Sequence, residues 1–123
     1  MAKITLGNTP KTFAPVVVTF PMPDGTEGTI EAVFKYRSRK QFGEFLRDTF
    51  KVDEKPGELD LAAIMAASVD QNGAYLADVL DAWNLDEKLT PDATAQLADE
   101  LPAAAKALMQ AYSAAVTEGR LGN

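Results

Sequence analysis

The sequence predicts an α+β fold: an N-terminal antiparallel β-hairpin or small sheet packed on a helix, then an all-helical C-terminal half with about four further helices. Three alanines precede residue 56 and seventeen follow it, whereas β-branched and aromatic residues cluster early. Alanine favours helices, and the early residue types favour strands. Residues 1–55 carry nine bases and seven acids, and residues 56–123 carry three and eleven, so the net charge changes from +2 to −8. We expect a single domain over residues 1–123 with these two parts.

A β-hairpin is expected first. Apolar residues alternate in two runs, which is the period-2 pattern of half-buried antiparallel strands. The first run is Val16, Val18 and Phe20, and the second is Ile30, Ala32, Phe34 and Tyr36. Between them, Asp24-Gly25 is a strong turn dipeptide, preceded by two prolines, Pro21 and Pro23, that cannot extend a central strand. A shorter run, Lys3 to Leu6, is a candidate edge strand.

A helix over residues 38–50 follows the hairpin. Ser38 and Gln41 have the spacing of a capping box, in which each side chain bonds the other residue's backbone N–H. Apolar side chains then recur at helical spacing in a single stripe: Phe42, Phe45, Leu46 and Phe50. We expect the phenylalanines to pack on the sheet face formed by Ile30 and Phe34.

The acidic half reads as a series of helices. We expect one at about 59–69, a break at Asp70 to Gly73, and another at about 74–83 that places Trp83 in the core. Thr90-Pro91 is a helix start, with threonine as N-cap and proline at the first helical position, and this helix ends near Glu100. The last helix runs from about Pro102 to Thr117, with Gly119 as its C-cap.

Composition excludes much chemistry. The chain has no cysteine and no histidine, which removes disulfides, thiol catalysis, serine–histidine triads and Cys/His zinc sites. No phosphate-binding glycine loop and no EF-hand occur. We therefore expect no enzyme activity, no catalytic residue, no cofactor and no metal. The longest apolar stretches are too short to span a bilayer, and the N-terminus lacks a signal-peptide core, so a cytoplasmic protein is expected.

One basic patch stands out, at residues 35–40. Its candidate partner-binding residues are Tyr36, Arg37, Arg39 and Lys40. Such a patch attracts phosphates or acidic surfaces, but a solvated strand end and helix start would have the same composition. The net charge of −6 argues against nucleic acid. Bases at a helix N-terminus also oppose the helix dipole, which points to an acidic partner surface, either on another protein or in the acidic half of this chain. Asp78 and Asp81 are interpreted as a solvated helix face, because no pocket is evident around them.

The order of these features resembles a known family. Phe34-Lys35-Tyr36-Arg37 leads straight into a helix, Trp83-Asn84-Leu85 precedes Thr90-Pro91, and a last helix opens at Pro102 and carries Ala111-Tyr112. This is similar to the small tail assembly chaperones of long-tailed bacteriophages and prophages, over about Phe13 to Ala115. In that family an aspartate is commoner where this chain has Asn84.

The resemblance implies a chaperone in the host cytoplasm, one that is absent from the finished virion. It would bind the tape measure protein, keep it soluble and help to recruit tail tube protein subunits. Homo-oligomerisation is left open, and no membrane partner is implied. Three other functions compete with this one: a structural tail component of the tube or terminator type, a small nucleic-acid-binding regulator, and a carboxylate-based enzyme.

Overall fold

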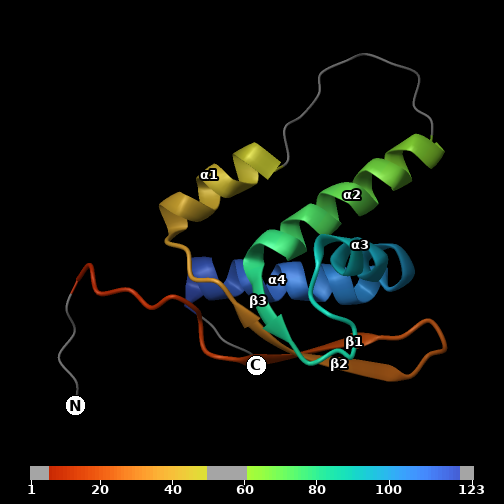
Figure 1. The fold of residues 1–123 in the computed structure, drawn as a ribbon, viewed down its shortest axis with the longest axis horizontal. Helices are drawn as coiled ribbons and strands as arrows, with labels where there is room; N and C mark the ends of the chain where they lie inside the picture. The colour runs from red at the N-terminus through yellow and green to blue at the C-terminus, as the bar shows by residue number, and fades with distance from the viewer. Residues whose placement is uncertain (1–5, 50–60, 120–123) are drawn as a thin grey trace.

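The computed structural model describes residues 6–49 and 61–119 and confirms the α+β class. Its elements along the chain are β1 (Val16–Pro21), β2 (Glu27–Phe34), α1 (Arg39–Thr49), α2 (Leu61–Val79), β3 (Leu80–Trp83), α3 (Pro91–Glu100) and α4 (Pro102–Glu118). The three strands form one antiparallel sheet in the order β1-β2-β3 (Figure 1).

The expected hairpin is present. β1 pairs with β2 from Val16 opposite Ala32 to Pro21 opposite Glu27. The turn is closed by Asp24, whose carboxylate accepts hydrogen bonds from the backbone N–H and the hydroxyl of Thr26. Gly25 has a φ of 90°, a conformation that glycine adopts without steric cost. Leu6 lies in a turn, and the rest of the candidate strand from Lys3 lies outside the described residues.

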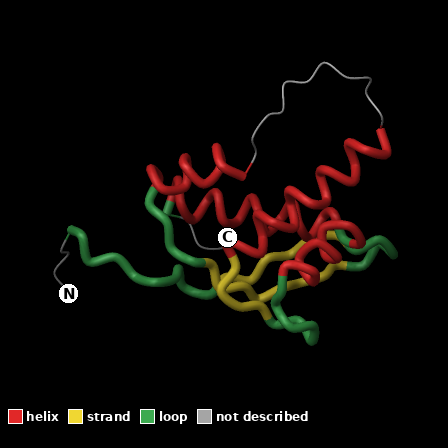
Figure 2. Tube along the Cα trace, turned by 45° about the horizontal axis from the view of Figure 1, so that its top comes forward, coloured by secondary structure: helices red, strands yellow, loops and turns green. Residues whose placement is uncertain are grey.

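The sheet is covered on one face. The alternating side chains of β1 and β2 that point inward are buried, from Val16 to Phe34, while those between them are exposed or half-buried. In Figure 2 the helices lie on one side of the strands. α4 lies between the sheet and the pair formed by α1 and α2 (Figure 1). The core therefore has α4 at its centre, with Leu108 and Tyr112 fully buried.

The prediction of an all-helical C-terminal half is wrong in one respect, because this half contributes a strand to the sheet. α2 runs unbroken through Asp70 to Gly73, and the chain then becomes β3 at Leu80, so Trp83 lies on a strand. β3 pairs with the end of β2, and this pairing gives hydrogen-bond partners to backbone groups that follow the end of α2. The described part of this half thus has three helices rather than about four.

Gly73 does not break α2, for a tertiary reason. A Cβ at this position would lie 2.7 Å from the Cα of Ala95, so the missing side chain lets α2 and α3 approach each other closely. The carbonyl of Gly73 also accepts a 2.8 Å hydrogen bond from the hydroxyl of Thr94, a fully buried side chain. The close contact with α3 therefore explains why a glycine lies inside this helix.

The phenylalanines of α1 pack elsewhere than predicted. Phe42 lies 5.5 Å from Tyr112 of α4, and Phe45 lies 5.1 Å from Tyr75 of α2, between ring centroids. They do not rest on the sheet because α4 occupies that face. The predicted capping box is present: the backbone N–H of Ser38 donates to the Gln41 side chain at 2.9 Å, and the N–H of Gln41 donates to the Ser38 hydroxyl at 3.3 Å.

The predicted caps at the start of α3 and at the end of α4 are also confirmed. The Thr90 hydroxyl accepts from the N–H of Ala93 at 3.1 Å, with Pro91 opening α3. Gly119 ends α4 with a φ of 66°, and its N–H bonds the carbonyl of Ala114.

Candidate partner-binding surfaces

The end of β2 is joined to α4 through the hydroxyl of Tyr112. This hydroxyl donates to the carbonyl of Lys35 and accepts from the guanidinium of Arg37, both at 3.1 Å. Four further rings surround that of Tyr112 with centroids 5.3 to 6.2 Å away: Phe13, Phe34, Phe42 and Tyr75. Tyr112 thus connects the sheet, α1 and α2 at one point.

Arg37 makes further contacts within the chain. It forms an ion pair with Asp78 of α2, and its guanidinium lies 4.2 Å from the ring centroid of Phe45. Asp78, predicted as a solvated carboxylate, is therefore a partner of this arginine. Burial lowers the pKa of Arg37, but the hydrogen bonds to Tyr112 and Asp78, together with the charge interactions with the same two groups, raise it overall. Arg37 stays charged, and it is tied to α1, α2 and α4.

The pKa of the Tyr112 hydroxyl is raised chiefly by burial, against the opposing effect of its bond to Arg37. Burial likewise raises the pKa of Tyr75 well above the ordinary value for tyrosine. Both phenols are therefore neutral near pH 7 and act as hydrogen-bonding and packing groups.

The four predicted partner-binding residues do line one hollow. This basic hollow, of about 510 Å³, is bounded by Phe13, Tyr36, Arg37, Ser38, Arg39, Lys40, Ala115, Val116 and Gly119. The residues differ in how far they face solvent: Arg39 and Lys40 are exposed at the start of α1, whereas Tyr36 and Arg37 are half-buried. Arg39 and Lys40 are thus the cations in this hollow that are most open to a partner.

A second hollow, which sequence reasoning missed, lies between α1, α2 and α4. This three-helix groove has a volume of about 470 Å³, and its apolar lining is Phe42, Leu46, Tyr75 and Met109. Its polar lining is Asn72, Lys106, Gln110 and Ser113. The apolar stripe of α1 was visible in the sequence, but a stripe does not show which part of it remains uncovered. Leu46 and Met109 are both half-buried.

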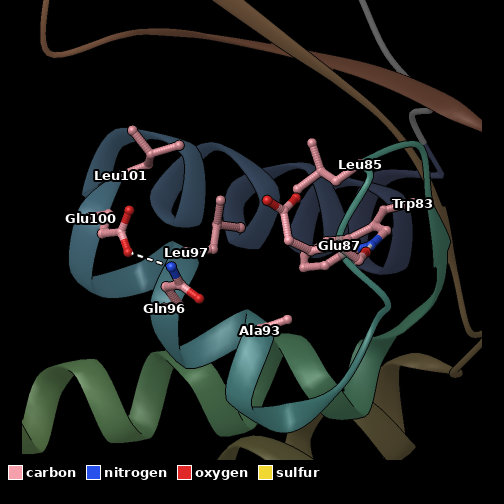
Figure 3. A pocket seen from close by; sticks show the side chains of 8 residues that line it. All are labelled: Trp83, Leu85, Glu87, Ala93, Gln96, Leu97, Glu100 and Leu101. Atoms are coloured by element: carbon pink, nitrogen blue, oxygen red, sulfur yellow. Dashed lines mark hydrogen bonds between the residues drawn. The ribbon is translucent and has the colours of Figure 1, made fainter.

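A third, smaller hollow is lined by Trp83, which was predicted to be core and which packs against the core as a partly buried side chain. This tryptophan pocket, of about 160 Å³, is lined by Trp83, Leu85, Glu87, Ala93, Gln96, Leu97, Glu100 and Leu101 (Figure 3). Trp83 is half-buried, and its indole N–H donates to the backbone carbonyl of Glu87 at 2.8 Å. The side chain thus stays partly accessible at the edge of the sheet.

The described ranges contain neither a cluster for a metal ion nor a membrane-spanning helix. Residues 6–49 and 61–119 contain no group of three or more acidic side chains arranged to hold a metal ion. Within the same ranges, no helix is both long and apolar enough to cross a membrane.

Comparison with known proteins identifies the family. A family model described as phage tail assembly chaperone matches residues 1–123, the whole chain. The comparisons with curated proteins and with solved structures gave no match. The match agrees with the resemblance of the motifs around Trp83, Thr90 and Pro102. The chain belongs to the phage tail assembly chaperone family.

Proposed function

We propose that this chain binds the tape measure protein, keeps it soluble and helps to recruit tail tube subunits, without being retained in the virion. Family membership supports a role in tail assembly with phage tail proteins as partners. It also suggests a non-enzymatic role, which is consistent with the absence of histidine and cysteine. The proposed place of action is the host cytoplasm.

The three-helix groove is the observation that carries the proposal. A long helical client exposes apolar stripes, which are stable in water only when a partner covers them, and helix-in-groove recognition does this with anchors at i, i+3, i+4 and i+7. The groove offers two aromatic rings together with Leu46 and Met109. Methionine adapts to differently shaped ligands, so it suits a client with many similar segments. The polar side chains at its boundary supply hydrogen bonds.

The basic hollow extends this surface along the same helices. The start of α1 and the end of α4 line the basic hollow, whereas the middles of both helices line the groove. In this proposal Arg39 and Lys40 contact acidic groups of the client, Tyr36 adds apolar contact area, and Arg37 holds the β2–α1 junction in place. Attraction to acidic groups gives orientation and association rate more than affinity.

The test is co-expression of the tape measure protein with variants of this chain. Leu46→Glu with Met109→Glu places two charges in the groove, and we expect the soluble fraction of tape measure protein to fall to its level without chaperone. Val17→Glu is the control for a new surface charge outside the groove, because Val17 is 59% exposed on the outer sheet face. Circular dichroism of each variant checks that it is folded before client solubility is compared.

Two further arms complete the test. Arg39→Glu with Lys40→Glu should reduce client solubility, while Lys88→Glu, a base outside both hollows, should not. Equal solubility with the groove variant and with the wild type would contradict the proposed client surface. Mass spectrometry of purified virions should lack this chain, since its presence at stoichiometric amounts would indicate a structural tail component.

A further inference from the structure

The tryptophan pocket is separate from the proposed client surface and has a different character. It lies between the end of β3, the connector to α3 and one face of α3, and none of its lining residues belongs to the three-helix groove or the basic hollow. Its volume of about 160 Å³ is close to that of a cavity that holds one benzene-sized group. The pocket therefore accommodates one side chain rather than a helix.

The lining is apolar in its depth and acidic at its boundary. Leu97 is buried, while Leu85 and Leu101 are half-buried beside it. The carboxylates of Glu87 and Glu100 are both exposed, and in Figure 3 they flank Leu97. Gln96 donates a 2.6 Å hydrogen bond to Glu100, which holds that carboxylate at the pocket. An apolar interior with carboxylates at the mouth matches a long side chain that has an alkyl stem and a cationic end.

Trp83 adds a second reason to expect a cation. Its indole N–H is already bonded to the carbonyl of Glu87, so what it offers the pocket is its ring. Indole rings attract arginine and lysine cations through their quadrupole, and the planar guanidinium also stacks on them. Two carboxylates and a tryptophan ring together favour arginine over lysine, because the guanidinium presents several donors in a fixed plane.

The surrounding charge selects the class of partner. Residues 80–101 carry six acids and one base, a net charge of −5. None of these six acids forms an ion pair with another side chain in the described part of the chain. This field repels nucleic acids and anionic lipid surfaces and attracts a basic protein segment.

We infer that the tryptophan pocket binds an arginine side chain from a basic amphipathic segment of a protein partner. The arginine stem contacts Leu97 and Leu101, and its guanidinium lies between Glu87, Glu100 and the ring of Trp83. Neighbouring bases of the segment meet the exposed acids around the pocket. This second docking site does not depend on the groove that is proposed for the tape measure protein.

The test uses the fluorescence of Trp83, the single tryptophan of the chain. The probe is a synthetic amphipathic helical peptide with arginines on its polar face, titrated into the full chain. A peptide with citrulline in place of every arginine is the neutral control. We expect a saturable change in emission with the arginine peptide and little change with the citrulline peptide. Equal binding of both peptides would overturn the inference, because the occupant would then be recognised by apolar contact alone.

Matched variants separate the pocket from the general acidic field. Glu87→Gln with Glu100→Gln should weaken binding at least about tenfold, the loss typical when charge-assisted hydrogen bonds are removed. Asp86→Asn with Asp99→Asn changes the net charge equally in the same segment but alters no lining residue, so it should weaken binding by less than about threefold. Equal losses in both pairs would overturn the pocket as the binding site.

A third variant leaves the charge unchanged. Ala93→Leu fills the pocket with a good helix former and should abolish the emission change while the thermal midpoint is kept. Binding that survives in this variant would also overturn the inference. None of these measurements uses the tape measure protein, so their outcome and that of the client test are independent.

Discussion

Replacing Tyr112 by phenylalanine tests the junction at the centre of the fold. The substitution keeps the ring and its four aromatic neighbours but removes a fully buried hydroxyl that makes two hydrogen bonds of 3.1 Å. The carbonyl of Lys35 loses its donor, and Arg37 loses one acceptor while it keeps Asp78. The carbonyl of Lys35 is only part-buried. Leaving such an acceptor unpaired and losing the bond from Arg37 should together lower the free energy of unfolding by about 1–3 kcal/mol.

Urea denaturation followed by circular dichroism measures this loss. Tyr36→Phe is the matched control, because Tyr36 is half-buried and its hydroxyl makes no hydrogen bond within the described residues. The control should change the free energy of unfolding by less than about 0.5 kcal/mol. Equal effects of the two substitutions would refute the role given to the Tyr112 hydroxyl.

Three further predictions concern stability. Gly73→Ala should destabilise the chain by about 1–3 kcal/mol, because the new Cβ would meet the backbone of Ala95. A Cβ at Gly43 in α1 would meet nothing within 4 Å, so Gly43→Ala should stabilise the chain by up to about 1 kcal/mol in the same urea titrations. Burial raises the pKa of Tyr75 and Tyr112 above the ordinary 10.0, so the folded state disfavours their ionisation. The free energy of unfolding should therefore be constant near neutral pH and fall as pH rises above about 10, where the unfolded tyrosines ionise. The fall should be less steep in Tyr75→Phe. Ser38→Ala removes the cap of α1 and should lower the free energy of unfolding by about 1 kcal/mol, with a loss of helical signal.

Local signals in the sequence predicted several elements correctly. The alternation of Val16, Val18 and Phe20, the Asp24-Gly25 turn and the Ser38–Gln41 box each depend on residues near one another in the chain. Thr90 and Gly119 were predicted as caps for the same reason. A cap or turn is stabilised by its own side chains, so a single sequence is enough to find it.

Errors arose where distant contacts decide the structure. Leu76, Val79, Leu80 and Trp83 have helical spacing, but pairing with β2 converts the last two into a strand. Gly73 resembles a helix break, although its role is to admit Ala95 of α3. The four predicted partner-binding residues line one hollow, yet the sequence could not show that Arg37 turns toward Tyr112, which lies 75 positions away in the chain. The groove was missed because its walls come from three helices whose packing is set by tertiary contacts.

The most direct test of the proposed function is hydrogen exchange of this chain, alone and with the purified tape measure protein. We predict slower exchange in the helical segments that form the three-helix groove, residues 42–46 of α1, 72–75 of α2 and 106–113 of α4. The backbone amides of the β1–β2 hairpin should exchange at an unchanged rate. In Leu46→Glu with Met109→Glu this protection should disappear while the fold is kept. Protection confined to the hairpin, or unchanged by the groove variant, would contradict the proposed client surface.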